Sequence, residues 1–499
     1  MSRRIILRVF RFLAVCCLSC GHAFTTAGEP AQETLTPSDK VYSCVFHVHS
    51  KVSAGGSYSL AELTALARRD GVDAIFLTDN LTSTIEYGLP PLRHVLRISY
   101  SRPSVMVTGP LAYLEMVETE NRRQSDVLHV PGVEVCPRFY WTGSIKGKNL
   151  VCHNHQRNVI AVGTTNAAVL AGIPEARGYV WKEDPVWMAV SVIGPVLLLL
   201  LLLSAAGVSR FLSRTSPYSR EDILRSYFLS IVLPLAVLVL ATNGAASFMP
   251  SFDIYGEDNI ARHEQRTIDF LRENGVAHYW AHPEAKDEQD FTCLNVPFKV
   301  RTAPYPEMLV KTGGYTGFGG VYEDINTLTD TNSLWDTVLA EYAAGRRKVP
   351  VWCFGEMLYH YEGQAGKKFG NVETMVSAAE KTAPALLRSL RDGRFYARNN
   401  SENQSLTLEE WKVQAAEQGF LDVSLSVASR APGEKVRVLL IRNGQLAKDV
   451  DGVTPLRLDL HDSAPAGSGI SYYRAVVTGA YPLKLVTNPL FVTAGAAAK

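Results

Sequence analysis

Two long runs without a charged residue constrain how this chain can fold. They cover residues 186–208 and 228–249 and contain only apolar and small polar side chains. The first run is 23 residues long. A helix of that length at about 1.5 Å per residue spans roughly 34 Å, which is enough to cross a bilayer. We therefore expect two transmembrane helices, joined by a loop over 209–227. The length and purity of both runs disfavour the alternative of two helices buried in a soluble core.

The charges around these runs predict their orientation. The connecting loop is rich in arginine, whereas the outer flanks are acidic, with Glu183, Asp184, Asp253, Glu257 and Asp258. The positive-inside rule places the loop in the cytoplasm and both flanks outside it. Because two spans return the chain to the side it left, the segments before residue 186 and after residue 249 can build one domain.

The N-terminus agrees with this topology. Residues 1–28 combine a cationic start (Arg3 to Arg11), the apolar stretch Phe12–Cys20, and small residues at Ala23 and Ala27. This pattern is typical of a secretory signal peptide, with a retained anchor as the alternative. We expect a protein of the inner (cytoplasmic) membrane whose main domain is extracytoplasmic or periplasmic. The formal net charge of +1 and the lack of a basic block argue against nucleic acid as a partner.

Strand and helix patterns alternate on both sides of the two runs. Ser59 and Glu62 form a capping box at the start of a predicted helix, and Gly71 ends it. The alternation predicts an α/β fold with a parallel sheet. The expected strands are Val41–His47, Val72–Thr78, Val127–Val135, Val159–Val162, Val276–Ala281, Tyr315–Tyr322 and Pro350–Phe354. The other expected helices are 111–124, 259–273, 334–344 and 373–390, the last kinked at Pro384.

The C-terminal region has a different character. Val423, Leu425 and Val427 alternate with polar residues, which is typical of a half-buried strand. The pair Asn443-Gly444 is a strong hairpin signal. We expect a small β-sandwich over residues 401–499.

Residues that can bind a metal follow the predicted strands. His47 and His49 end the first strand, Asp79 the second and Glu134 the third, while His282 and His360 follow later strands. The carboxyl ends of parallel strands meet on one face, and imidazole and carboxylate groups bind divalent metals there. Each residue also has an ordinary alternative, such as a turn aspartate or a histidine satisfied within the core. Their repetition at strand ends favours a metal site.

At these residues the chain resembles the PHP (polymerase and histidinol phosphatase) superfamily. The resemblance covers about residues 41–395 and rests on four motifs: Phe46-His47-Val48-His49-Ser50, Gly71 to Asp79, Val130 to Val135, and Ala281-His282-Pro283. It implies a distorted (β/α)7 barrel, here built from residues 29–185 and 250–400, with the membrane hairpin inserted between them. It also implies two or three divalent metals, often zinc, manganese or iron, and phosphoester hydrolysis.

The resemblance also suggests roles for individual residues. His47 and His49 match a pair of metal ligands, Glu134 a carboxylate that bridges metals, and His282 a further ligand. His360 matches the histidine of the closing motif, in which case Leu358 replaces an aspartate. In the alternative register, Glu356 replaces that aspartate.

Other positions depart from the family pattern. Asn80 and Asn158 stand where histidine ligands are expected, although His153 or His155 lies close enough to substitute, and Ala54 replaces an aspartate. Asparagine is a poor zinc ligand. We therefore expect one or two ions, held by His47, His49 and Glu134 together with residues drawn from Asp79, His155, His282, Glu356 and His360.

Two functions remain open from the sequence. The first is a membrane-tethered metal-dependent hydrolase, a phosphoesterase acting on a phosphorylated small molecule or polymer, with His282 or His360 as general acid. The second is a catalytically degenerate domain that serves as a binding or scaffold module. The lost ligands favour the second and the surviving histidines favour the first. The sequence predicts no oligomeric state.

Overall fold

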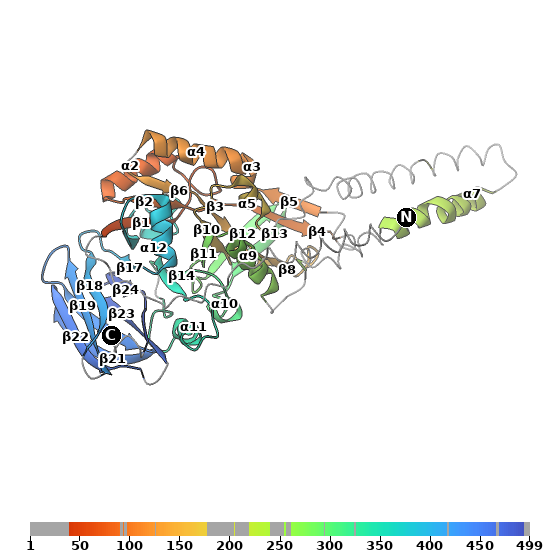
Figure 1. The fold of residues 1–499 in the computed structure, drawn as a ribbon. Helices are drawn as coiled ribbons and strands as arrows, with labels where there is room; N and C mark the ends of the chain where they lie inside the picture. The colour runs from red at the N-terminus through yellow and green to blue at the C-terminus, as the bar shows by residue number, and fades with distance from the viewer. Residues whose placement is uncertain are drawn as a thin grey trace, which may run out of the picture. The chain divides into compact units, whose positions relative to one another are not determined.

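The structure is a computed structural model (Figure 1). It describes residues 39–89, 93, 97–124, 126–176, 204, 219–239, 254–255, 261–293, 295–323, 326–416, 419–465 and 469–493. The predicted signal peptide lies outside the described residues, as does the predicted span 186–208 except for Ser204.

A ring of hydrogen-bonded strands forms the centre of the fold. It runs through β1 (Lys40–Val48), β2 (Ala74–Leu77) with β3 (Asp79–Asn80), β6 (Leu128–Val130) with β7 (Gly132–Val135), β10 (Val159–Val162), β11 (Ala277–Trp280), β14 (Gly317–Val321) and β15 (Trp352–Gly355). The chain after β15 returns to β1, since Tyr359 N donates to His47 O at 2.8 Å and His49 N donates to Tyr359 O at 2.9 Å. The predicted α/β class is therefore confirmed.

The prediction of a wholly parallel sheet is wrong at β10. This strand pairs antiparallel with both β7 and β11. The chain between β7 and β10 forms two short strands, β8 (Tyr140–Thr142) and β9 (Leu150–His153), and no crossover helix among the described residues. A parallel connection needs a crossover that returns the chain to the starting end of the sheet. Asn158, at the start of β10, consequently lies at the same end of the ring as Glu134 of β7.

Helices flank the ring largely as the sequence indicates. They are α2 (Leu60–Asp70), α3 (Val105–Thr108), α4 (Pro110–Arg123), α5 (Ala167–Gly172), α9 (Arg262–Glu273), α10 (Met308–Lys311), α11 (Leu334–Ala343) and α12 (Ala383–Arg391). The capping box at Ser59 and the left-handed C-cap at Gly71 are confirmed.

The prediction of one kinked helix over 373–390 is wrong. That stretch contains the wholly buried strand β16 (Val372–Ala378) followed by α12, in which Pro384 stands in the first turn. Proline is well tolerated there, because the first-turn N–H groups have no intrahelical partner. Thr382 caps the helix by accepting from Ala385 N. Pro384 thus marks a helix start rather than a kink.

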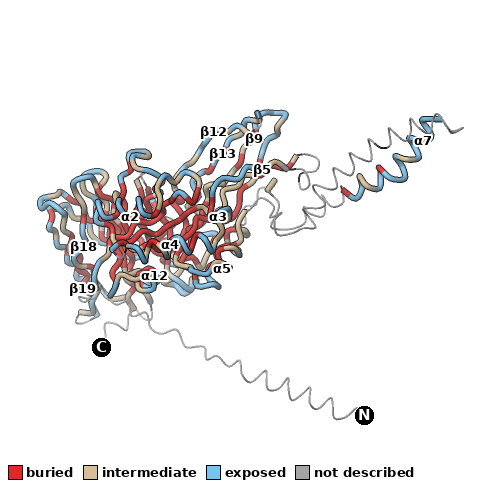
Figure 2. The backbone as a smooth tube through the Cα atoms, turned by 90° about the horizontal axis from the view of Figure 1, so that it is seen from above, coloured by how far each residue is buried: buried red, intermediate tan, exposed pale blue. Residues whose placement is uncertain are grey.

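The C-terminal strands form two sheets around their own core. β18 (Leu406–Ala415), β19 (Phe420–Ser429) and β22 (Leu456–Ser463) form one sheet. β20 (Lys435–Arg442), β21 (Gln445–Val453), β23 (Ile470–Thr478), β24 (Lys484–Thr487) and β25 (Leu490–Thr493) form the other, which continues through β17 (Phe395–Asn399) and β16 to β1. The predicted Asn443-Gly444 turn is confirmed, since both residues have positive φ and join β20 to β21. Figure 2 shows the buried interior of the ring beside these strands.

One helix among the described residues is long and apolar enough to cross a membrane. It covers Arg220–Val239, comprising α7 (Arg220–Tyr227), the π-helical turn η1 (Phe228–Val232) and a further stretch to Val239. The helix begins eight residues before the predicted membrane span, which starts at residue 228. Ser219 caps the helix by accepting from Asp222 N, so the second half of the predicted 209–227 loop is helical. With one such helix described, the two-helix hairpin is not supported by the structure.

Candidate metal centre

Two histidines are brought to the end of β1 by a local irregularity. The pairing of β1 with β2 shifts register between Phe46 and Val48, and His47 between them has a φ of 65°. Both His47 and His49 are fully buried. In a regular strand, residues two apart share a face. Here the bulge changes the direction of the His47 side chain. His47 and His49 therefore point to the same side, as predicted, although the strand between them is not regular.

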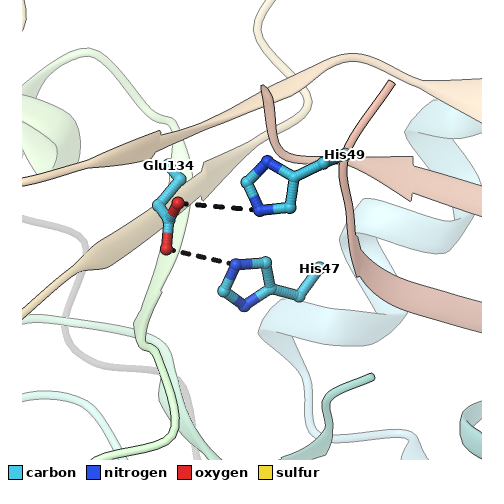
Figure 3. Close-up of side chains that lie close together, drawn as sticks. All are labelled: His47, His49 and Glu134. Atoms are coloured by element: carbon cyan, nitrogen blue, oxygen red, sulfur yellow. Dashed lines mark ion pairs between the residues drawn. The ribbon is translucent and has the colours of Figure 1, made fainter. Parts of the chain in front are cut away.

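Both imidazoles face Glu134 of β7 (Figure 3). His47 Nε2 lies 3.2 Å from Glu134 Oε1, and His49 Nε2 lies 3.6 Å from Glu134 Oε2. Among the described residues, neither Nε2 atom has a hydrogen-bond partner. We call these two atoms the open nitrogens. The three ligand atoms lie within 4.8 Å of one another, so the three side chains could hold one metal ion.

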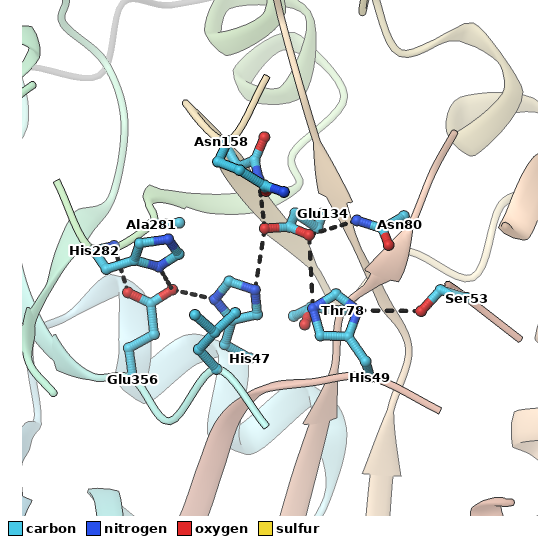
Figure 4. Close-up of polar contacts among 12 residues, drawn as sticks. His47, His49, Ser53, Thr78, Asn80, Glu134, Asn158, Ala281, His282 and Glu356 are labelled. Carbon is cyan, nitrogen blue, oxygen red and sulfur yellow. Dashed lines mark hydrogen bonds and ion pairs between the residues drawn. The ribbon is translucent and has the colours of Figure 1, made fainter. Parts of the chain in front are cut away.

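The other nitrogen of each ring is already engaged (Figure 4). His47 Nδ1 bonds to Glu356 Oε1, and His49 Nδ1 lies 3.1 Å from Ser53 Oγ. The Ser53 hydroxyl donates to Asp79 at 2.7 Å, so Ser53 accepts from His49 Nδ1–H. These contacts place a proton on Nδ1 of each ring, and at the neutral His49 they leave a lone pair on Nε2. Partners of this kind fix the tautomer of metal-binding histidines.

The charge states make His49 the more informative of the two residues. Burial lowers the pKa of His49 well below its usual value, and nearby His360 lowers it further. His49 is therefore neutral, and its Nε2 lone pair faces a carboxylate oxygen. Burial also lowers the pKa of His47, but Glu134 and Glu356 outweigh that effect and raise it to about 9. At His49, two hydrogen-bond acceptors face each other: the Nε2 lone pair and the Glu134 Oε2 atom. A cation bound between the three side chains would remove this unfavourable contact.

Glu134 is held in place by two amides. Asn80 Nδ2 donates to its Oε2 at 2.5 Å, and Asn158 Nδ2 donates to its Oε1 at 2.6 Å. Burial acts to raise the pKa of Glu134, but His47 and His49 hold it well below the ordinary value, so the carboxylate is ionised. Asn80 and Asn158, which stand where the family pattern expects metal ligands, thus orient the carboxylate instead.

A second cluster lies on the other side of His47. His282 Nδ1 is 3.4 Å from Glu356 Oε1, and the His282 backbone N–H donates to Glu356 Oε2 at 2.6 Å. His47, His282 and Glu356 could also hold a metal ion. Burial opposes ionisation of Glu356, but His282 and His47 lower its pKa to about 2. Since the ring nitrogens here already contact the carboxylate, the open nitrogens favour the Glu134 cluster as the first metal position.

The backbone around this cluster is strained. Besides His47, both His282 (φ 21°) and Leu358 (φ 46°) have positive φ values. Gly319 leaves room for Glu356, because a Cβ atom there would lie 1.7 Å from Glu356 Oε2. Strain of this kind costs about 1–3 kcal/mol per residue and collects at functional sites.

Three further predicted ligands lie outside both clusters. Asp79 is buried and accepts from Ser50 N at 2.7 Å, Ser50 Oγ at 2.8 Å and Ser53 Oγ at 2.7 Å, so its oxygens hold the loop after β1. His360 stacks on His49 at 4.3 Å, and its Nδ1 lies 3.2 Å from Gln364 Oε1. His155 packs against Phe139 with ring centroids 5.8 Å apart. A ligand role for these three residues stays a prediction.

Sequence reasoning missed the supporting contacts made by Ser53 and Gln364. Ser53 follows His49 by four residues and Gln364 follows His360 by four, but serine and glutamine at such spacings are common in loops. Only the fold shows that they meet the histidines.

Comparison with known proteins leaves the family open. No protein-family model matches the chain, and no curated protein matches it. A solved structure from Bacteroides vulgatus ATCC 8482, described as a two-domain protein containing a predicted PHP-like metal-dependent phosphoesterase, matches over 92% of this chain and 96% of its own. The sequence identity is 11% and the TM-score is 0.37.

Proposed function

We propose that this protein is a metal-dependent hydrolase of phosphate esters. The observation that carries the proposal is the pair of open nitrogens facing the ionised Glu134 at 3.2 and 3.6 Å in a buried setting. The His49 Nε2 atom and the Glu134 carboxylate are both acceptors, a buried contact between acceptors is costly, and a divalent cation removes that cost. Two imidazoles and a carboxylate suit zinc, manganese or iron.

His47, His49 and Glu134 would hold the ion, which leaves His282 free to transfer a proton. A bound metal of this kind lowers the pKa of its water to about 7 and neutralises charge on phosphoryl oxygens. The chain's own residues would then hold the metal ligands in place and transfer protons. Asn80 and Asn158 fix Glu134, while Ser53 and Asp79 fix His49.

His282 is the proposed proton donor to the leaving oxygen. Its side chain is held by Glu356, and it stacks on His47 with ring centroids 5.4 Å apart. His360 is the second candidate, but its pKa is lowered to about 4, chiefly by burial. A group with so low a pKa is neutral near pH 7 and poorly suited to donate a proton. This favours His282.

We also propose that the strand ring is a PHP-type (β/α)7 barrel and that the chain is tethered to the membrane, with this domain extracytoplasmic. The barrel is supported by the closure of β15 onto β1 and by the site at one end of the strands. Tethering is supported by the helix Arg220–Val239, whose side chains are largely exposed, as expected for a surface that faces lipid. Thr215→Cys and Asp422→Cys test the orientation through labelling by a membrane-impermeant thiol reagent in whole cells. The cysteine at position 422 should be labelled and the one at position 215 should not, so labelling of both would contradict the proposal.

The test of the hydrolase combines metal content with turnover. The purified full-length protein in detergent should carry at least one equivalent of zinc, manganese or iron and should hydrolyse a chromogenic phosphate ester. His49→Gln should lose both properties. His461→Gln, a histidine exposed on β22 and paired with Asp422 at 2.8 Å, should keep both.

The scaffold alternative predicts the opposite result. It is favoured by the two amides, since Asn80 and Asn158 direct N–H donors at the carboxylate that would bind metal. A wild-type protein that stays metal-free and inert after incubation with each of the three metals would overturn the hydrolase proposal and leave the scaffold.

A further inference from the structure

Three insertions extend the ring at the same end as the metal centre. The hairpin of β4 (Thr84–Gly88) and β5 (Arg97–Ser101) follows β3, the strands β8 and β9 lie between β7 and β10, and β12 (Asp287–Cys293) with β13 (Val296–Thr302) follows β11. Each insertion therefore begins a few residues after a strand that carries a site residue. Figures 1 and 2 show β5, β12 and β13 together at the end of the molecule away from β18 and β19.

These insertions enclose an apolar pocket. The pocket has a volume of about 430 Å³, including its opening. Its walls are almost entirely hydrocarbon, with Tyr87, Tyr100, Trp141, Leu150, Val296 and Phe298 among the lining residues. Tyr100 is 51% exposed at the edge. A pocket with hydrocarbon walls is suited to a flexible alkyl chain rather than to a sugar or a nucleotide.

The pocket lies where the chain leaves for and returns from the segment with the predicted membrane helices. Before that segment, Ala176 N donates to Cys136 O at 2.8 Å, just beyond β7. After it, Ile254 O accepts from Trp141 N at 2.7 Å, and the Tyr255 hydroxyl accepts from Gly88 N at 2.5 Å. Ala176, Ile254 and Tyr255 pack against the same apolar cluster as the pocket-lining Trp141. The described residues at both ends of that segment thus pack beside the pocket.

Polar residues connect the pocket region with the metal centre. Asn158, which donates to Glu134, also donates to Gln156 Oε1 at 3.1 Å, and Gln156 N donates at 3.0 Å to Thr302 Oγ1 at the end of β13. Arg102 follows β5, whose Tyr100 lines the pocket. Two exposed lysines, Lys146 and Lys148, follow the pocket residue Ile145. Cations at these positions suit an anionic headgroup at a membrane surface.

From this arrangement we infer that the substrate is a lipid phosphate, whose hydrocarbon chain enters the apolar pocket while its phosphoryl group reaches the His47–His49–Glu134 centre. The inference rests on the proposed hydrolase. For a phosphomonoester, a bond forms between the water oxygen and phosphorus, the bond from phosphorus to the lipid oxygen breaks, and that oxygen takes a proton from His282. The products are inorganic phosphate and a lipid alcohol.

The first test measures chain binding without turnover. The probe is phosphatidic acid with brominated acyl chains, in phosphatidylcholine vesicles, added to the full-length protein in nanodiscs. Bromine quenches nearby indoles, so the part of the fluorescence contributed by Trp141, obtained by subtracting the signal of Trp141→Phe, should be quenched. Tyr100→Asp should weaken the quenching about 10-fold or more, because it places a charge among apolar walls. Leu446→Asp, at a residue 50% exposed on β21, should leave it unchanged. Equal quenching in wild type and Tyr100→Asp, with both folded by near-UV circular dichroism, would overturn the inference.

The second test compares substrates that share a headgroup. Dioleoyl phosphatidic acid in the same vesicles should be hydrolysed with a kcat/KM about 100-fold above that of soluble dibutyryl phosphatidic acid, since each buried methylene contributes a several-fold gain. Equal values would overturn the lipid inference and leave the phosphoesterase intact. Conversely, chain-dependent quenching in a protein that contains no metal and hydrolyses neither compound would overturn the hydrolase, and with it the assignment of this lipid as substrate.

Discussion

Two buried polar clusters in this molecule differ in how fully their atoms are paired. In the first, Arg474 of β23 bonds to Asp336 of α11 at 2.6 and 2.9 Å, donates to the carbonyls of Thr329 and Asp330, and stacks over Trp335. In the second, around Glu134, the open nitrogens have no donor among the residues described. The first cluster is complete without a ligand, whereas the second becomes complete only with a cation.

The comparison separates a structural role from a functional one. A buried charge that is fully paired joins elements together, here the C-terminal strands to the ring. Buried acceptors that converge on one carboxylate add nothing to folding unless something binds between them. A single buried ring nitrogen without a partner does not by itself indicate a metal site, because His129 Nδ1 and His278 Nε2 are also buried without partners in the described part of the chain. The metal centre differs because two such nitrogens, from His47 and His49, face the same carboxylate.

The largest predicted effect is on the complete cluster. Arg474→Met leaves the Asp336 carboxylate buried without its cation, and we expect the free energy of unfolding to fall by about 3–5 kcal/mol. Urea denaturation followed by circular dichroism measures this. Arg437→Met removes an exposed pair with Asp449 and should change stability little. If the two variants lose the same stability, the pair of Arg474 and Asp336 does not join the C-terminal strands to the ring.

The next effect concerns an isolated buried histidine. Burial lowers the pKa of His278 to about 4. The unfolded chain takes up this proton near pH 6.5, whereas the folded protein does so only near pH 4. The unfolded state therefore gains protons first as the pH falls, and stability should drop by about 3 kcal/mol between pH 6.5 and 4 from this residue.

His278→Asn should flatten the curve of unfolding free energy against pH in that window, while the exposed control His461→Asn should not. A curve for His278→Asn parallel to the wild-type curve would show that His278 is not held neutral. It would then resemble His47, whose pKa is raised, rather than the neutral His49.

The third effect tests the incomplete cluster directly. Adding zinc or manganese to the metal-free protein at about 100 times the dissociation constant should raise the free energy of unfolding by about 2.7 kcal/mol, because the ion binds only the folded state. His49→Gln should abolish this gain, since it removes one open nitrogen. Arg474→Met should show the full gain from its lower baseline. A gain that survives in His49→Gln would place the ion elsewhere.

The sequence predicts the ingredients of this site better than their arrangement. His47, His49, Glu134 and His282 follow strands that alternation and β propensity identify, so their convergence could be anticipated. The three insertions could not: β4, β8 and β12 are short or largely exposed strands, and their pattern is indistinguishable from loops. The antiparallel direction of β10 follows from the missing crossover and not from its four apolar residues.

The metal-site roles of polar residues show the same limit. Asp79 ends a strand beside the histidines, and its position alone suggests a ligand. In the structure its oxygens are engaged by Ser50 and Ser53. Asn80 and Asn158 suggest lost ligands, yet both donate to Glu134. Which atoms face the ion and which face its ligands depends on side-chain direction, and spacing along the chain does not determine that direction.

The smallest predicted effect is on the support of His49. Ser53→Ala removes the hydroxyl that accepts from His49 Nδ1 and donates to Asp79. We expect metal affinity to fall about 10–100-fold, as for other contacts that orient a ligand, while the metal-free protein keeps its fold. Competition with a fluorescent chelator measures the affinity, and Ser424→Ala on β19 is the matched control. If Ser53→Ala binds metal as tightly as the wild type, the ring of His49 is oriented by its stacking on His360, and the Asp79–Ser53 contacts serve only the loop.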